Sequence, residues 1–226
     1  MRRRTFLAAP TLLVAPALAA TPLVVAELFT SQSCSSCPPA DALLGEIAAR
    51  PDVLALAFHV TYWDRAGWRD PFSLPEATDR QRRYAATLSG AYGRGQLYTP
   101  QLVVQGRRDV VGSDREAVLA ALSAVEVPRV ALSAALHQGR VVAQAGAGEG
   151  LGTLWLIGYD ARHETQVQRG ENAGRRLVDV NVVRSIERIG AWSGAALRAE
   201  EPKPAGEHVA VLLQGLDGVI LGAARV

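Results

Sequence analysis

The residues best suited to chemistry in this sequence are its two cysteines, Cys34 and Cys37, which two serines separate. An apolar run over residues 22–29 precedes the pair and predicts a buried strand. Two prolines follow the pair and suit the first turn of a helix over residues 38–50. We therefore expect the thiols at a helix N-terminus, where the helix dipole lowers the pKa of a thiol.

Such a pair is typical of thiol–disulfide exchange through a mixed disulfide with a partner protein. Cys34 lies nearer the polar loop and is the predicted attacking thiol, whereas Cys37 falls in the first helical turn and is the predicted resolving thiol. A purely structural disulfide is a weak explanation, because so short a loop constrains the unfolded chain little. The leading hypothesis is an oxidoreductase that acts on a protein partner and needs no further cofactor.

Two other functions remain open for the same cysteines. Two thiolates and a histidine can hold copper(I) or zinc, and His59 lies at the end of an expected strand over residues 53–60. The cysteines would then belong to a metal carrier. The second alternative is an interaction module whose disulfide is inert. The sequence contains neither G-x-S-x-G nor H-E-x-x-H, so no motif supports a hydrolase.

Glu27 is a further candidate, because it shares one alternating face of the first strand with Val25 and Phe29. A carboxylate buried beneath the disulfide would assist proton transfer. The alternative is an edge glutamate that faces water or pairs with an arginine. Aromatic and charged residues also gather over residues 61–72, either as a partner-binding surface or as a packed insert.

Several motifs together resemble one bacterial family. The cysteine motif reads Phe-Thr-Ser-Gln-Ser-Cys-Ser-Ser-Cys-Pro-Pro-Ala-Asp over residues 29–41. Further motifs that carry the resemblance lie at residues 59–64, 67–72, 98–101, 170–175 and 181–184. The sequence resembles the secreted thioredoxin-like group called "domain of unknown function twelve-twenty-three" over nearly the whole mature chain. Ser33 and Thr61 depart from the family pattern, in which we expect glycine and aspartate.

The resemblance implies a thioredoxin-like fold but no particular activity, because the family has no settled function. In thioredoxin-like folds a cis proline faces the cysteine pair. The Thr99–Pro100 bond is therefore expected to be cis, and Pro100 joins the candidate catalytic residues. Residues 170–172, with Arg175 and Arg184, are expected to dock the second half of the chain onto the first, and a ligand site there is the alternative.

An α/β arrangement is needed to position these residues. Capping boxes at residues 73–76 and 113–116 predict the starts of two more helices. Strand-like runs at residues 102–104 and 110–111 lie between these helices. This order predicts a thioredoxin-like domain over residues 21–127, with helices against a mixed sheet and a helical insert.

The pattern changes after Pro128, where short apolar runs alternate with glycine-rich turns. We expect an antiparallel, sandwich-like β module over residues 128–226. Its strands are predicted at residues 130–136, 140–145, 154–159, 167–169, 177–186, 209–213 and 219–221.

Residues 1–20 are predicted to be an export signal that is removed. Three arginines open the chain, an apolar stretch covers residues 6–18, and Ala17-Leu18-Ala19 offers a cleavage site. The order Arg3-Arg4-Thr5-Phe6-Leu7 resembles the twin-arginine pattern. We therefore expect a bacterial protein that is periplasmic or secreted.

Removal of that segment changes the formal charge from +2 to −1, because it carries three arginines and no acid. The rest of the chain has no basic stripe of the kind that nucleic-acid binding requires. It also has no apolar run that approaches the ~20 residues needed to span a bilayer. The predicted partner is thus another protein, and the sequence leaves the oligomeric state open.

Overall fold

The computed structural model describes residues 22–65, 67–126 and 128–226. The predicted export signal, residues 1–20, lies outside the described residues. The helices of the described chain are α1 (Pro38–Ala48), α2 (Pro75–Thr87) and α3 (Arg115–Ser123), with a short 3-10 helix, η1, at Thr61–Trp63. In the part of the chain that is described, no helix is both long and apolar enough to cross a bilayer.

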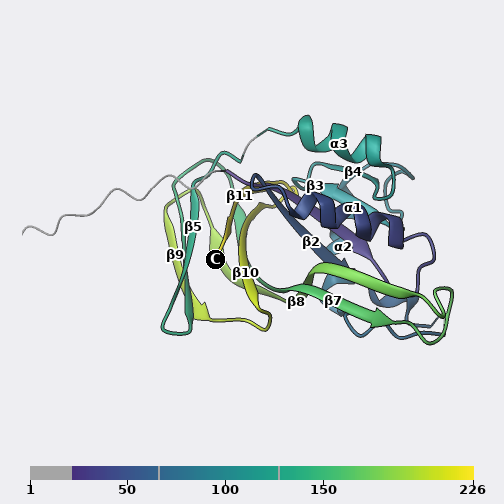
Figure 1. Ribbon diagram of the computed structural model, residues 1–226. Helices are drawn as coiled ribbons and strands as arrows, with labels where there is room; N and C mark the ends of the chain where they lie inside the picture. Colours follow the sequence, from purple (N-terminus) through teal and green to yellow (C-terminus); the bar gives the residue numbers. More distant parts are fainter. Residues whose placement is uncertain (1–21, 66, 127) are drawn as a thin grey trace, which may run out of the picture.

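Eight strands form one mixed sheet in the order β11-β10-β7-β8-β2-β1-β3-β4 (Figure 1). One half of it consists of β1 (Val24–Thr30), β2 (Val53–His59), β3 (Gln101–Val104) and β4 (Arg108–Val111). β1 and β2 are parallel and joined by α1, whereas β3 is antiparallel to both β1 and β4. β1 and β2 are buried along nearly their whole length, as expected for strands covered on both faces. The prediction of an α/β fold with a mixed sheet is confirmed.

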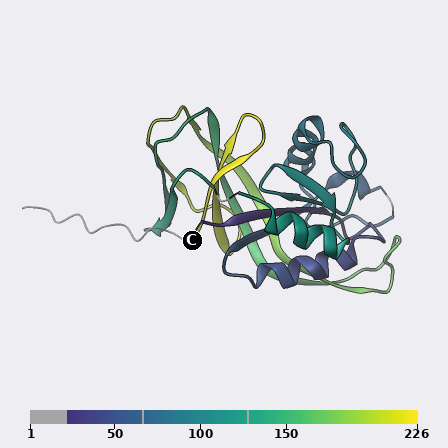
Figure 2. The same ribbon diagram turned by 90° about the horizontal axis from the view of Figure 1, so that it is seen from above.

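The helices lie on both faces of this sheet (Figure 2). α1 and α3 cover one face, where Leu44 and Val118 pack with Leu28 of β1. α2 covers the other face, where Tyr84 packs edge-on against Phe29 of β1. Because side chains alternate between the faces of a strand, neighbouring residues of β1 contact different helices.

The strands after residue 128 extend the large sheet and add a small one. The large sheet continues through β7 (Gly152–Gln166), β8 (Arg176–Trp192), β10 (His208–Gly215) and β11 (Ile220–Arg225). The small antiparallel sheet consists of β5 (Leu132–His137), β6 (Arg140–Ala145) and β9 (Leu197–Pro202). β8 joins β2 in parallel, and Val141, Leu156 and Val211 belong to a core that both sheets share. The division of the chain into two domains near residue 128 stays a prediction.

Some local predictions were wrong where tertiary contacts decide the outcome. Residues 167–169, expected as a strand, belong to the connection between β7 and β8, which are 15 and 17 residues long. Ser73 does not cap α2, because its hydroxyl donates to Asp64 at 2.8 Å. The cap of α3 is Asp114 and not Ser113.

A buried ion pair fastens α2 to the sheet. The carboxylate of Glu27 on β1 accepts hydrogen bonds from the guanidinium of Arg80 and, at 2.6 Å, from the hydroxyl of Tyr84. Gln214 of β10 accepts from Arg80 at 3.1 Å and donates to Tyr84 at 2.9 Å. These contacts satisfy the buried charges, which would otherwise be strongly destabilising.

Replacing Arg80 by methionine leaves the Glu27 carboxylate buried without its counter-charge, so we expect the free energy of unfolding to fall by about 3–5 kcal/mol. Urea unfolding followed by circular dichroism measures this change. Arg82→Met is the matched control on the same helix, because Arg82 is 60% exposed and its loss should cost no more than about 0.5 kcal/mol. The double variant Glu27→Leu/Arg80→Met should recover most of the loss, and equal losses for Arg80→Met and the control would contradict this account.

Candidate functional site

Cys34 and Cys37 form a disulfide at the N-terminus of α1, with their Cα atoms 5.4 Å apart. Cys37 is the N-cap residue, and its carbonyl accepts hydrogen bonds from the amides of Ala40 and Asp41. The two prolines that follow occupy the first helical positions, where an N–H would have no partner within the helix. The predicted placement of the pair at a helix start is confirmed.

The disulfide is closed off from solvent. Both cysteines are 0% exposed, whereas Ser35 and Ser36 between them are exposed. Exposure therefore does not distinguish the two cysteines, and the assignment of Cys34 as the attacking thiol stays a prediction. The hydroxyl of Ser36 lies 3.3 Å from the Sγ of Cys34. A partner protein has no direct access to either sulfur atom here.

The connection between β7 and β8, residues 167–175, binds the cysteine loop, and we call it the cover segment. Figure 1 shows the β7–β8 hairpin reaching the end of the sheet where β1 stops and α1 starts. The Nδ2 atom of Asn172 donates to the carbonyls of Gln32 and Cys34, each at 2.9 Å. Glu171 accepts from the backbone N–H of Ser35 at 3.0 Å. These contacts confirm that residues 171 and 172 dock the two halves of the chain.

The two arginines expected to help in this docking differ in their contacts. Arg184 pairs with Asp160 at 2.8 Å within the β7–β8 hairpin, and its guanidinium also lies 5.3 Å from the ring centre of Phe72 in the first half of the chain. Arg175 contributes its backbone, which donates to the carbonyl of Asn172 at 3.0 Å. Hydrogen bonds to Ser35 hold the pKa of Glu171 below its usual value. The attachment of the cover segment therefore depends on Glu171 and Asn172.

A cluster of buried ionisable groups lies behind the cysteine loop, formed by Asp41, His59, Asp70 and Asp179. Asp41 accepts from the hydroxyl of Thr30 at 2.7 Å. The Nδ1 atom of His59 lies 2.7 Å from Asp70, which also accepts from the backbone of Gln32 at 2.8 Å. The side chain of Gln32 donates to Asp179 at 2.7 Å. The cluster thus reaches the cysteine loop through hydrogen bonds.

Burial sets the protonation of this cluster. Burial and the charge of Asp179 raise the pKa of Asp41 to about 7. Burial also raises the pKa of Asp179 above its ordinary value. For His59, burial lowers the pKa, but the charge of Asp70 and the hydrogen bond to it outweigh that effect and raise the pKa to about 9. Below pH 9 the cluster therefore holds an imidazolium beside Asp70, and Asp41 titrates near neutral pH.

Sequence reasoning singled out only His59 from this cluster, and only as a metal ligand. The sequence could have placed Asp41 near the cysteines, because Asp41 follows Cys37 by four residues and therefore lies on the same face of α1. No local pattern could have placed Asp179 there, because it accepts a hydrogen bond from Gln32, which is 147 residues away in the sequence. In residues 22–65, 67–126 and 128–226, no group of three or more His, Cys, Asp and Glu side chains is arranged to hold a metal ion.

The Thr99–Pro100 bond is cis, as expected from the resemblance. Pro100 and Ser36 line one cavity of about 460 Å³, so the proline loop opens beside the residues between the cysteines. Tyr92, Leu97 and Tyr98 also line this cavity, and Tyr92 is 61% exposed. The cavity combines apolar and hydroxyl groups next to the disulfide.

Glu27 lies apart from the disulfide. Its side chain shares its face of the sheet with Val25 and Phe29, on the side that α2 covers. The disulfide begins α1, which packs on the opposite face through Leu28. The carboxylate is instead paired with Arg80, which corresponds to the second of the two interpretations of this residue.

The aromatic residues over 61–72 mostly pack within the protein. Trp63 donates to the hydroxyl of Thr99 at 2.8 Å, and Trp68 donates to the side chain of Gln32 at 3.2 Å. Phe72 is buried, with its ring centre 5.6 Å from that of His59. This segment therefore supports both the proline loop and the cysteine loop.

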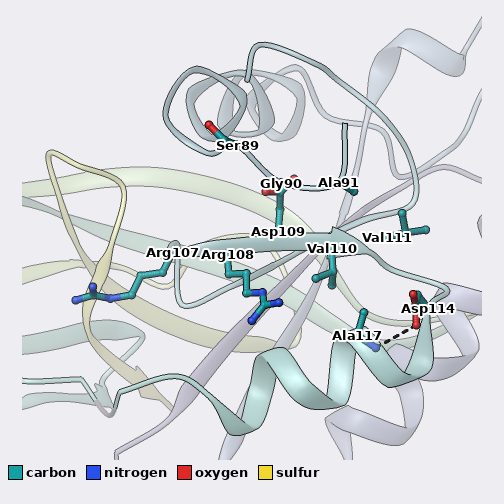
Figure 3. A pocket seen from close by; sticks show the side chains of 10 residues that line it. All are labelled: Ser89, Gly90, Ala91, Arg107, Arg108, Asp109, Val110, Val111, Asp114 and Ala117. Atoms are coloured by element: carbon teal, nitrogen blue, oxygen red, sulfur yellow. Dashed lines mark hydrogen bonds between the residues drawn. The ribbon is translucent and has the colours of Figure 1, made fainter. Parts of the chain in front are cut away.

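Another cavity, of about 420 Å³, lies between residues 89–91, β4 and the start of α3 (Figure 3). The carboxylate of Asp109 points toward Gly90, whereas the side chains of Arg107 and Arg108 point away from it. Asp109 already accepts from the hydroxyl of Tyr98 at 2.9 Å. Neither cysteine lines this cavity, so it is separate from the candidate site.

Comparison with known proteins places this geometry in a family. The crystal structure of protein AGR_C_4864 from Agrobacterium tumefaciens is similar with a TM-score of 0.78 and 30% identity, over 90% of this chain and 93% of that one. HBP35 of Porphyromonas gingivalis shares the fold at 14% identity and a TM-score of 0.63, over 91% of this chain and 75% of that one. Comparison with curated proteins gives no match. The family model "Protein of unknown function (DUF1223)" matches residues 25–214, and the chain therefore belongs to that family.

Proposed function

We propose that this protein is an exported thioredoxin-like thiol–disulfide oxidoreductase that exchanges its Cys34–Cys37 disulfide with the cysteines of a partner protein. The observation that carries the proposal is a closed disulfide at a helix N-terminus, one helical turn from a buried carboxyl whose pKa is about 7. The cavity that Ser36 and Pro100 share supplies room for a partner segment beside the disulfide.

The topology supports the thioredoxin-like assignment. A β1-α1-β2 unit precedes an antiparallel β3-β4 pair and α3, and these strands lie in the order β2-β1-β3-β4. α1 and α3 share one face, with α2 on the other. The cis bond before Pro100 stands at the start of β3, where that fold carries its proline.

The atoms and electrons of the exchange balance without a cofactor. In the reduced protein, the Cys34 thiolate attacks one sulfur of a partner disulfide, which forms a mixed disulfide and releases one partner thiolate. Cys37 then loses its proton and attacks the sulfur of Cys34, which releases the second partner thiolate. Two electrons pass to the partner, and the Cys34–Cys37 disulfide of this structure is the product. The reverse sequence oxidises a partner dithiol.

Asp41 is the group we assign to accept the proton of Cys37. The two residues are four apart on α1 and therefore lie on the same helix face. A carboxyl with a pKa near 7 is matched to proton transfer at neutral pH. Glu27 was the sequence candidate for this task, but Arg80 and Tyr84 occupy its carboxylate on the other face of the sheet.

In cells that export the full chain, a Cys37→Ser variant should accumulate mixed disulfides between Cys34 and exported partner proteins, because the resolving thiol is missing. Non-reducing gels followed by mass spectrometry of the reduced bands identify these partners. Cys34→Ser is the matched control and should trap none. Equal trapping by both cysteine variants would refute the assigned roles.

The same trapping assay tests the export route. Replacing Arg3 and Arg4 by lysine should abolish trapping if export follows the twin-arginine route.

The Asp41→Asn variant should slow the second step of exchange near pH 7 and shift its pH dependence to the higher pH at which the Cys37 thiol itself loses its proton. In the wild type, this step should accelerate as the pH rises through about 7, because Asp41 accepts a proton only when it is ionised. Reduced protein mixed with 5,5′-dithiobis(2-nitrobenzoate) releases one coloured thiolate when Cys34 reacts and a second when Cys37 resolves. Asp52→Asn is the control, because Asp52 is an exposed acid after the same helix.

Stability provides an independent check on the same variant. The pKa of Asp41 in the folded protein lies above its ordinary value of 3.8, so its contribution to stability is full below about pH 4 and is lost as the pH rises through about 7. Asp41→Asn should therefore unfold at higher urea than the wild type at pH 8, by a margin that shrinks toward pH 4. A slow second step in a variant that is also unstable at pH 8 would point to misfolding.

Because the disulfide is buried, exchange requires the cover segment to move. Asn172→Ala removes the two hydrogen bonds to the loop carbonyls, so dithiothreitol should reduce the disulfide about tenfold faster. The rate is followed by alkylation of the new thiols. Gln168→Ala is the matched control, because Gln168 is exposed on the same segment and its side chain donates to the carbonyl of Gln166 at the end of β7, not to the cysteine loop. An unchanged rate for Asn172→Ala would show that this contact does not limit access.

A further inference from the structure

A third cavity lies on the face of the sheet that α2 covers, opposite to α1 and the disulfide. It has a volume of about 300 Å³ and opens between α2, β7 and the turn after β10. This volume is at the lower end of the range for small-molecule sites, about 300–1,000 Å³. The lining residues used below are Arg80, Arg83, Trp155 and Leu216.

The charges in this cavity do not cancel. Arg80 is buried and neutralised by Glu27. Arg83 is exposed at the mouth of the cavity, and among the described residues no carboxylate oxygen lies within 4.0 Å of its guanidinium. The nearby acid on the same helix, Asp79, is paired with Arg82 at 2.8 Å. The cavity therefore carries one net positive charge at its wall.

The surroundings of Arg83 are unfavourable for a guanidinium that has no carboxylate beside it. Its guanidinium lies 5.4 Å from the ring centre of Trp155, and that of Arg80 lies 5.9 Å from the same ring. Burial, followed by the charge of Arg80, lowers the pKa of Arg83. An anion in the cavity would relieve both effects, because it would replace the lost hydration and offset the repulsion between the two arginines.

The cavity also has an apolar wall, although Thr87, Thr153 and Gln214 line other parts of it. Leu216 is 74% exposed at its rim, and its backbone N–H donates to the carbonyl of Leu151, which is itself 57% exposed. The indole of Trp155 forms the inner wall under the two guanidinium groups. Exposed leucines beside a hollow that is lined by a partly buried aromatic ring form the kind of surface that takes up an apolar group.

We propose that this cavity binds a small organic carboxylate with an apolar body. The carboxylate would lie against Arg83, whose planar fork of donors matches two carboxylate oxygens. The apolar body would lie along Trp155 and Leu216. An inorganic anion would leave the apolar wall in water, and an uncharged apolar molecule would leave Arg83 without an anion. The cavity lies on the face of the sheet opposite to the disulfide, so this proposal does not depend on the proposed redox function.

Titration of the full mature protein with octanoate tests the proposal, with binding followed by calorimetry. We expect saturable binding at one site, and about tenfold weaker binding of octanol, which has the same apolar chain without the charge. Arg83→Gln should weaken octanoate binding about tenfold but leave octanol unaffected. Arg82→Gln is the matched control, because Arg82 is a neighbouring arginine on the same helix that does not line the cavity, and it should bind octanoate as the wild type does.

Three results would overturn the proposal: no saturable octanoate binding, equal affinities for octanoate and octanol, or equal affinities of the Arg83→Gln and Arg82→Gln variants for octanoate. A Leu216→Ser variant keeps the test decisive if Arg83→Gln proves unstable, because Leu216 is exposed and its loss should weaken both probes without affecting folding. Octanoate binding should persist in Cys34→Ser, which separates a failure of this site from a failure of the redox function.

Discussion

The buried backbone of the cysteine loop is the constraint on which the candidate site depends. Residues 30–34 are polar but buried, and a buried N–H or C=O without a partner costs about 1–3 kcal/mol. Ser31 supplies two of the required hydrogen bonds from within the loop. The N–H of Gln32 depends on Asp70, and two loop carbonyls depend on Asn172. The aromatic insert and the β7–β8 hairpin are therefore needed to complete the loop that holds the disulfide.

The same burial determines the electrostatics. His59 compensates the charge of Asp70, and together they hold the backbone of Gln32. Asp41 and Asp179 share the interior with this pair but have no cation of their own, so burial raises the pKa of each. A carboxyl that titrates near neutral pH thus follows from the packing of the loop. Burial thus both closes the disulfide from solvent and raises the pKa of the acid that we propose handles its proton.

The sequence could predict what local signals determine. Two prolines after Cys37 define the start of α1, and runs of apolar residues define the strands that flank it. It could single out residues 170–172 as a docking segment, but it could not predict which atoms they contact, because Asn172 and Cys34 are 138 residues apart in the sequence. Ser73 was wrongly predicted as a helix cap for a similar reason, since its hydroxyl donates to Asp64 instead. The partners of these side chains are set by long-range contacts, and no local sequence pattern identifies them.

The alternation of side chains along β1 explains why we assign different roles to Glu27 and Asp41. The side-chain period of a strand is two residues, so Leu28 faces α1 while Glu27 faces α2, and a rotamer change cannot move a side chain through the sheet. An acid that accepts the proton of Cys37, as we propose, would therefore have to come from the α1 side, where Asp41 lies. On the α2 side, Glu27 instead neutralises Arg80 and leaves Arg83 without a paired carboxylate in the cavity beneath α2. The sheet thus lies between the acid that we propose serves the disulfide and the cavity that we propose binds an anion.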